Sequence, residues 1–137
     1  MSAIDAGPLH HLGVVVPSLA GTIPFYRDVL GYAVGKEHHL DEQRVKVVFL
    51  TKGESRVELL EPTDTESGVA RFLKERGRAT MHHVCFEVAD LTVALARLSA
   101  QGIELVDKTP RRGALGMVAF LHPRAAGGVL VELLQRV

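Results

Sequence analysis

The sequence predicts an α+β domain made of two βαβββ modules that stand side by side and form a cleft. Three observations predict it. The length of 137 residues suits a single domain, expected to span residues 1–137. Two segments repeat each other's pattern, "LHHLGVVVPSLAGTIPFYRDVLGYAV" and "MHHVCFEVADLTVALARLSAQGIELV", with His11 and His83 72 residues apart. Each repeat then continues as strand, turn and strand, and both last strands contain V-E-L-L.

The first module is expected over about residues 8–62. It opens with an alternating apolar strand, followed by a helix whose N-cap is Ser18 and whose stop signal is Gly31. Pro24 lies inside this helix and is predicted to shorten or kink it, because proline lacks the backbone N–H. After a second strand, "VKVVFLTKGESRVELLEP" predicts a hairpin with its turn at Gly53.

A connector and a second module follow. The stretch "ESGVARFLKERG" predicts a short amphipathic connector helix over about residues 66–77. The second module is expected over about residues 80–136, with Asp90 as the N-cap of its helix and Gly102 as the stop, before a second strand at "GIELV". Its last two strands, in "GMVAFLHPRAAGGVLVELLQ", are predicted to be joined by a turn at Gly127.

Four polar residues fall on one face of the predicted strands. Because side chains alternate along a strand, the apolar rows show which face the helices cover. The first strand of each module places a histidine on the opposite face, and the last strand places a glutamate there. The four residues are His11, Glu58, His83 and Glu132.

These residue types indicate a metal site. Burial of an unpaired carboxylate such as Glu132, between Val131 and Leu133, costs several kcal/mol or more, so a compensating charge is needed. Neutral imidazole and carboxylate oxygen together suit divalent ions such as cobalt, zinc, nickel, iron or manganese. A lone strand histidine is more often a core or surface residue, and a strand glutamate can simply face solvent. Four such residues at matched positions of a repeat favour a metal site over these structural explanations.

Composition narrows the classes of partner and compartment. The chain has 16 basic and 16 acidic residues, so charge gives no case for binding nucleic acid or a membrane surface. No apolar run approaches the roughly 20 residues of a membrane span, and the first eight residues do not resemble a signal peptide. The single cysteine, Cys85, cannot form an internal disulfide. We therefore expect a cytoplasmic protein that binds neither nucleic acid nor membranes.

A family resemblance adds to these observations. The segments "HHLGVVVPSL", "FYRDVLGY", "DEQRVKVVFL", "VELLEP", "MHHVCFEVADL" and "GGVLVELLQ" resemble the vicinal oxygen chelate superfamily, which includes glyoxalase I and the extradiol dioxygenases. Their order covers nearly the whole chain. Within the superfamily, "DEQRV" and "FLHPR...GGVLVEL" are similar to the methylmalonyl-CoA epimerases.

The resemblance implies roles for particular residues. The family's metal ligands fall on His11, His83 and Glu132, and the remaining ligand position, which is Gln in some members, falls on Glu58. A catalytic carboxylate falls on Glu42 in "DEQRV", and Glu132 is its implied partner in proton transfer. That motif commonly has Gly where this chain has Arg44. A divalent ion is the implied cofactor, with Co²⁺ favoured over Zn²⁺, Ni²⁺, Mn²⁺ or Fe²⁺.

The implied activity is metal-dependent epimerisation of methylmalonyl-CoA by removal and return of the α proton, which places the chain in propionate metabolism. The implied partners are an acyl-CoA substrate and a second copy of the chain in a homodimer. Charge alone makes six residues candidates for binding CoA: Lys74, Arg76, Arg78, Arg111, Arg112 and Arg124. Two other functions stay open at this point, a glyoxalase-type lyase or isomerase and a non-catalytic small-molecule-binding protein of the same fold.

Overall fold

The computed structural model describes residues 2–137, which divide into two compact units. One unit comprises residues 11–82, and the other comprises residues 2–10 together with residues 83–137. Among the described residues, no helix is both long and apolar enough to cross a membrane.

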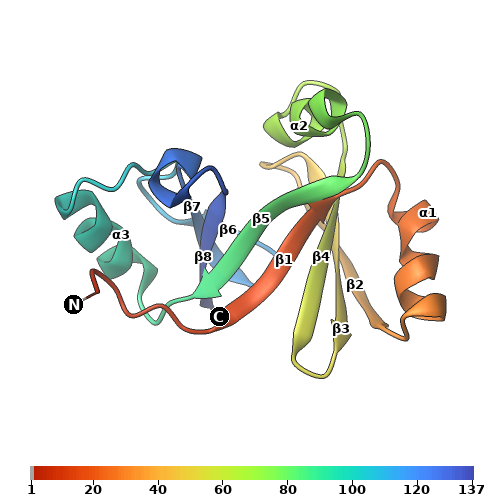
Figure 1. Ribbon diagram of the computed structural model, residues 1–137, viewed down its shortest axis with the longest axis horizontal. Coiled ribbons are helices and arrows are strands. Elements are labelled where there is room, and N and C mark those ends of the chain that lie inside the picture. Colours follow the sequence, from red (N-terminus) through yellow and green to blue (C-terminus); the bar gives the residue numbers. More distant parts are fainter. Residues whose placement is uncertain (1) are drawn as a thin grey trace. The chain divides into compact units, whose positions relative to one another are not determined.

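The unit of residues 11–82 contains a sheet, a helix beside it and the connector helix (Figure 1). Its strands have the order β2-β3-β4-β1, and β1 is parallel to β4 whereas the other neighbours are antiparallel. Its elements are β1 (Leu9–Val15), α1 (Leu19–Pro24), the π-helix η1 (Phe25–Val29), β2 (Ala33–Leu40), β3 (Val45–Lys52), β4 (Ser55–Pro62) and α2 (Gly68–Arg76).

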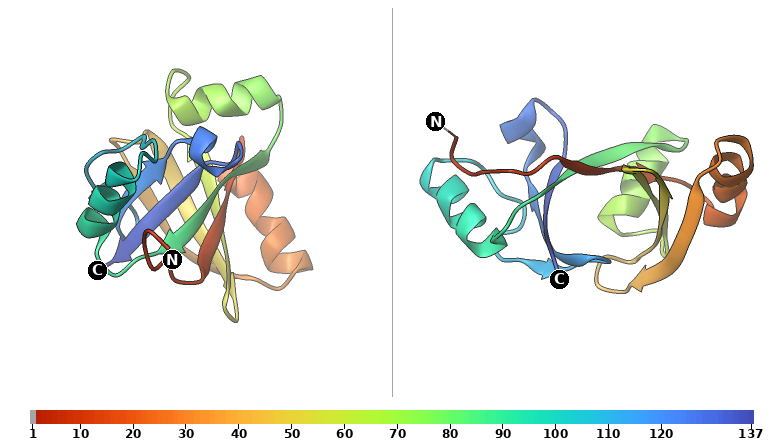
Figure 2. Two further views of the ribbon diagram at one scale, coloured as in Figure 1. Left: turned by 60° about the vertical axis from the view of Figure 1, so that its left-hand side comes forward. Right: turned by 90° about the horizontal axis from the view of Figure 1, so that it is seen from below.

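The unit that contains residues 83–137 repeats this arrangement, and Figure 2 shows α3 alongside its strands. Its strand order is β5-β8-β7-β6, again with one parallel pair, β5 with β8. Its elements are β5 (Thr80–Glu87), α3 (Leu91–Ala100), β6 (Arg111–Arg112), β7 (Gly116–Leu121), the 3-10 helix η2 (Pro123–Ala126) and β8 (Val131–Arg136). The predicted βαβββ order, and with it the α+β fold class, is confirmed.

The helix signals read from the sequence are confirmed. The side chain of Ser18 accepts a hydrogen bond from Gly21 N, and Asp90 caps α3 in the same way through Val93 N. Pro24 is the last residue of α1, and the chain continues as the single π turn η1 because proline cannot donate the next helical hydrogen bond.

The predicted second strand of the second module is wrong in place and length. The segment "GIELV" makes only one isolated bridge, between Leu105 and Leu121, and the strand β6 is two residues long. The physical reason lies at Asp107, whose Oδ2 accepts the Phe120 N–H at 2.8 Å. That N–H is therefore not available to a strand carbonyl, and the ladder stops there.

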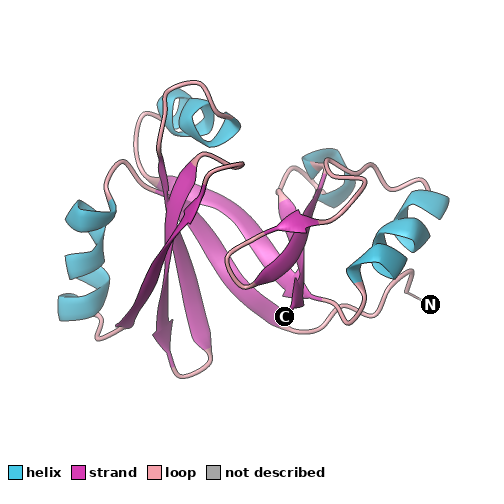
Figure 3. Cartoon of the chain, turned by 180° about the vertical axis from the view of Figure 1, so that it is seen from behind, coloured by secondary structure: helices cyan, strands magenta, loops and turns pink. Residues whose placement is uncertain are grey.

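The helices cover the predicted faces of the strands. In Figure 3 the helix α1 stands to one side of the strands of its own unit. It packs against Val16, Val48, Leu50 and Leu59, and α3 packs in the same way against Ala119, Leu121 and Leu133. The apolar rows therefore point to the helices, which leaves the predicted ligand residues on the other face.

Each helix is also tied to the strand that carries the candidate glutamate. Leu19 N donates to Glu61 Oε1 at 2.7 Å, and Leu91 N donates to Gln135 Oε1 at 2.8 Å. Both acceptors lie three residues after the glutamate of V-E-L-L. Since the first N–H groups of a helix have no partner inside the helix, these bonds satisfy one donor and join the helix start to the last strand of the module.

Candidate active site

His11 and Glu58 form the first of two buried pairs. The parallel register of β1 and β4 places Gly13 opposite Glu58, and His11 lies two residues earlier on the same face. The Nε2 atom of His11 is 3.3 Å from Oε1 of Glu58, and the two residues are only 4% and 7% exposed. The two residues that the sequence analysis placed on one face are therefore in contact and buried.

His83 and Glu132 form the second pair with the same construction. Cys85 lies opposite Glu132 in the parallel register of β5 and β8, and His83 precedes it by two residues. The Nε2–Oε1 distance is again 3.3 Å, and the residues are 3% and 7% exposed. The repeat seen in the sequence thus extends to the side-chain geometry of each unit.

Two phenylalanines support these pairs, and the sequence reasoning missed them. The ring of Phe49 meets the His11 imidazole edge to face at a centroid distance of 5.1 Å, and Phe120 meets His83 at 5.6 Å. Phe49 lies directly opposite Glu58 across the strands, as Phe120 lies opposite Glu132. The signal that could have found them is the repeat, since "VVFL" and "VAFL" precede the two hairpin turns at matching places.

Glu42 lies apart from the strands, in the turn of residues 41–44 that joins β2 to β3. Its side chain is exposed, and within residues 2–137 it has neither a hydrogen-bond nor an ion-pair partner. The turn is closed by backbone bonds from Gln43 N to Leu40 O and from Arg44 N to Asp41 O, both at 3.1 Å. The carboxylate is therefore on an ordered turn and has no internal partner.

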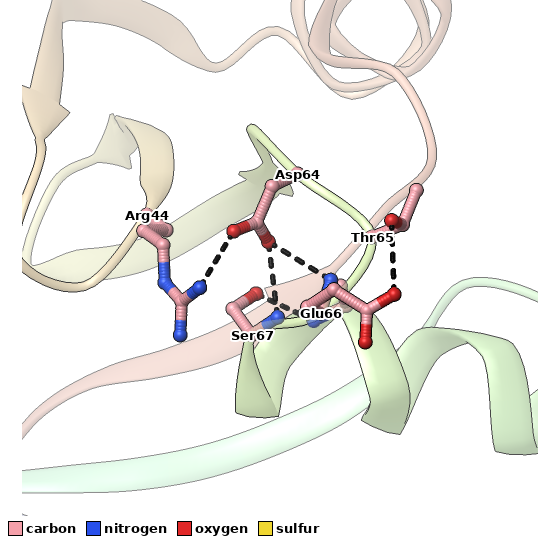
Figure 4. A network of polar contacts seen from close by, with 6 residues as sticks. Arg44, Asp64, Thr65, Glu66 and Ser67 are labelled. Carbon is pink, nitrogen blue, oxygen red and sulfur yellow. Dashed lines mark hydrogen bonds and ion pairs between the residues drawn. The ribbon is translucent and has the colours of Figure 1, made fainter.

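Arg44 ends this turn in a left-handed conformation, with φ of 56°. Its Nη1 atom is 2.8 Å from Oδ2 of Asp64 (Figure 4). Its carbonyl accepts a hydrogen bond from Thr63 N at 2.9 Å. Asp64 Oδ1 accepts the N–H groups of Glu66 and Ser67, and the Ser67 side chain caps α2. The turn that carries Glu42 is thus attached to the start of the connector helix.

Hydrogen bonding lowers the pKa of Asp64 below its ordinary value of 3.8. The largest cause is the bond from the Ser67 backbone N–H, and the bond from Glu66 N and the charge of Arg44 act in the same direction. The carboxylate that holds this turn to α2 is therefore ionised throughout the neutral range.

Comparison with known proteins agrees with this geometry. Residues 10–120 match the model of the Glyoxalase/Bleomycin resistance protein/Dioxygenase superfamily. The chain is 44% identical over 132 residues to the mitochondrial methylmalonyl-CoA epimerase of Bos taurus, covering 96% of this chain and 75% of that protein. This chain belongs to the methylmalonyl-CoA epimerase family. A crystal structure of the family member from Mycobacterium tuberculosis superposes with a TM-score of 0.92 at 33% identity, over 100% of this chain and 93% of that one.

A second family structure carries a ligand. It is described as methylmalonyl-CoA epimerase in complex with methylmalonyl-CoA and NH4⁺, and it matches with a TM-score of 0.91 and 32% identity over 97% of this chain and 96% of that chain.

The left-handed turn accounts for a departure from the family pattern. The family resemblance implies glycine at the position of Arg44, and a positive φ is the conformation that favours glycine. Arg44 adopts that conformation here, at φ 56°, while its side chain and carbonyl are both bonded to the segment that starts α2. The arginine therefore keeps the backbone shape that glycine would give.

The two buried pairs have the donor chemistry of a divalent-metal site. Two ligand atoms that each lie about 2.1 Å from one ion, at angles between octahedral and tetrahedral, are about 3.0–3.4 Å apart. The observed 3.3 Å from imidazole nitrogen to carboxylate oxygen falls in this range in both units. The residues present therefore fit a metal ion that is borderline to hard.

Proposed function

We propose that this chain interconverts the R and S epimers of methylmalonyl-CoA, which makes it an isomerase acting on an acyl-CoA. The observation that carries the proposal is the match to methylmalonyl-CoA epimerases over nearly the whole chain, together with an intact buried His–Glu pair in each module. The exposed, unpartnered Glu42 supplies the further carboxylate that proton transfer requires.

We further propose that His11, Glu58, His83 and Glu132 bind one divalent ion. Each module would contribute one neutral nitrogen and one carboxylate oxygen, and the two carboxylates would balance the charge of the ion. The identical 3.3 Å spacing in both pairs and the edge contact of a phenylalanine with each histidine support this assignment. Co²⁺ is the ion we expect first, ahead of Zn²⁺, Ni²⁺, Mn²⁺ and Fe²⁺.

Epimerisation requires a proton to leave one face of the α carbon and a proton to return to the other. Two carboxylates on opposite sides can do this without rotation of the intermediate, and we assign Glu42 and Glu132 to these roles. A divalent ion, when bound, supplies electrostatic stabilisation of the negative charge that develops on the thioester oxygen. Within the part of the chain that the structure describes, Glu42 has no partner, whereas Glu132 Oε1 lies 3.3 Å from His83 Nε2. Glu42 is therefore the freer base.

Solvent exchange tests the activity directly. One epimer of methylmalonyl-CoA is incubated with purified, metal-supplied protein in deuterated buffer, and we expect deuterium at the α carbon together with formation of the other epimer. No exchange with any of the five divalent ions would sink the proposal. A parallel assay with methylglyoxal and glutathione distinguishes a glyoxalase-type enzyme, which would turn over that pair instead. Metal analysis of protein purified without chelators distinguishes a metal-independent binding protein.

We also propose that the chain forms a homodimer and resides in the cytoplasm. The dimer is supported by the family resemblance and the location by the single, buried Cys85. Analytical ultracentrifugation tests the dimer, and a monomer at micromolar concentration would contradict it.

A further inference from the structure

Arg111 is a cation that the proposed mechanism does not use. It belongs to β6, where it lies opposite Val118 of β7. Alternation along these strands places Arg111 on the same face as Val118, Phe120 and the cross-strand partner of Phe120, Glu132. The charge therefore lies on the face of the sheet that carries the His83–Glu132 pair.

The guanidinium of Arg111 is held in place by two neighbours. Its Nε atom is 3.4 Å from Oδ1 of Asp107, and its central carbon lies 5.8 Å from the centroid of the Phe120 ring. Asp107 is itself fixed, because its Oδ2 accepts the Phe120 N–H and its own N–H donates to the Phe120 carbonyl. Contacts that already restrict a long side chain reduce the entropy that it loses when it binds a ligand.

The two terminal NH2 groups of the Arg111 guanidinium remain available to bind a ligand. Across residues 2–137, neither Nη1 nor Nη2 has a hydrogen-bond or ion-pair partner, and the side chain is 36% exposed. Asp107 occupies only the Nε side of the guanidinium. The outer edge still presents paired N–H donors, the arrangement that matches a carboxylate.

The two modules differ in charge at this position. The strand register gives Arg111 a counterpart in His38, which lies opposite Val47 as Arg111 lies opposite Val118. Arginine is permanently charged, and its planar fork has a geometry that imidazole lacks. At this position only the second module therefore has a permanently charged side chain. This asymmetry suits a substrate that is itself asymmetric.

We propose that Arg111 binds the free carboxylate of the acyl group and so selects dicarboxylic acyl-CoA substrates over monocarboxylic ones. The inference rests on the proposed function. The Phe120 ring contacts both groups, with its centroid 5.8 Å from the Arg111 guanidinium carbon and 5.6 Å from the centroid of the His83 imidazole, which puts Arg111 near the proposed reacting end of the substrate. The phosphates of CoA are a full pantetheine arm away from that end. A carboxylate beside the thioester is thus the anion that Arg111 can reach.

Binding measurements with two ligands test the proposal. Calorimetry on metal-loaded protein compares methylmalonyl-CoA with propionyl-CoA, which has the same CoA part and no free carboxylate. Arg111→Gln should lower the affinity for methylmalonyl-CoA about tenfold to a hundredfold, which is the usual effect of losing a charged hydrogen-bonded pair. The same variant should bind propionyl-CoA with an affinity within about twofold of that of the unmodified protein. The matched control is Arg97→Gln, at an exposed arginine of α3 on the other face of the sheet, which should change neither affinity.

A second variant guards against a structural effect. Arg111→Lys keeps the charge and loses the fork, so it should recover part of the lost affinity for methylmalonyl-CoA alone. Equal weakening of both ligands by Arg111→Gln, or no weakening of either, would overturn the proposal. A protein that shows the Arg111-dependent preference and no α-proton exchange would instead overturn the proposed epimerase function. The two failures are therefore distinguishable.

Discussion

Glu42 is an exposed carboxylate that has no partner among residues 2–137, and its replacement is the sharpest single-residue test of the mechanism. Glu42→Gln removes the proposed base and keeps the size of the side chain. We expect α-proton exchange to fall about a hundredfold to ten-thousandfold, the usual contribution of a general base. The bound metal, measured by elemental analysis, should be unchanged because Glu42 is not among the proposed ligands.

The control for this variant is Glu54→Gln, on the exposed turn between β3 and β4. It should leave exchange unaffected. Full activity in the Glu42 variant would show that the proton is moved by another group.

Phe120 tests how far the ligand residues depend on their support. Phe120→Leu keeps an apolar side chain but removes the ring that meets His83 edge to face. Groups that orient a metal ligand typically change metal affinity by about tenfold to a hundredfold, and we expect a loss toward the lower end because the contact is apolar. Competition with a chromophoric chelator measures it. Phe25→Leu, at an exposed phenylalanine, is the control, and an equal loss there would contradict the supporting role of Phe120.

At the scale of elements, the bond network around Asp64 links the Glu42 turn to α2. The pKa of the Asp64 carboxyl is lowered in the folded protein. Its contribution to the stability of the fold is therefore fully present above pH 3.8, the ordinary pKa value, and is lost as the pH falls through the lower pKa of the folded state. Asp64→Ala should therefore lower the thermal midpoint at pH 7, and the difference from the unmodified protein should narrow in strong acid. Thermal melts followed by circular dichroism at a series of pH values measure this.

Arg44→Gln is the companion to that experiment. It removes the ion pair to Asp64 but leaves the backbone N–H bonds of Glu66 and Ser67 in place. Since those bonds include the largest cause of the pKa shift, the Arg44 variant should lose less stability than Asp64→Ala. The reverse order would mean that the ion pair, and not the backbone bonds, holds the turn.

The same scale shows which elements could be predicted. The helix starts at Ser18 and Asp90 follow from side chains that bond to a backbone N–H three residues ahead, so local sequence was sufficient. The shortened strand β6 could not be predicted. It depends on Asp107 accepting the N–H of Phe120, 13 residues away, and nothing in the local pattern "GIELV" reveals that bond.

For the whole molecule, removal of the metal is the decisive experiment. If four residues from both modules bind one ion, the ion binds the folded state and not the unfolded chain. A free-metal concentration about 100 times the dissociation constant then adds about 2.7 kcal/mol to the free energy of unfolding. For a chain of this length we expect treatment with a chelator to lower the thermal midpoint by roughly 5–10 °C. Re-addition of the ion should restore the midpoint.

His83→Ala provides the comparison, because it should greatly reduce the effect of the chelator. Equal midpoints with and without chelator in the unmodified protein would favour a metal-independent binding protein of the same fold.

The sequence by itself determined the repeat, the helix ends and the faces of the strands. These features made four residues the candidate metal ligands: His11, Glu58, His83 and Glu132. These features depend on spacing of two residues along a strand or three to four along a helix, which any segment displays on its own. Only the tertiary structure decided that Phe49 and Phe120 support the histidines, that Arg44 bonds to Asp64, and that Arg111 lies over Phe120. Such contacts depend on the register between strands and on bonds between distant segments. Register depends on how two strands and the connection between them fit together, and so it cannot be read from one segment alone.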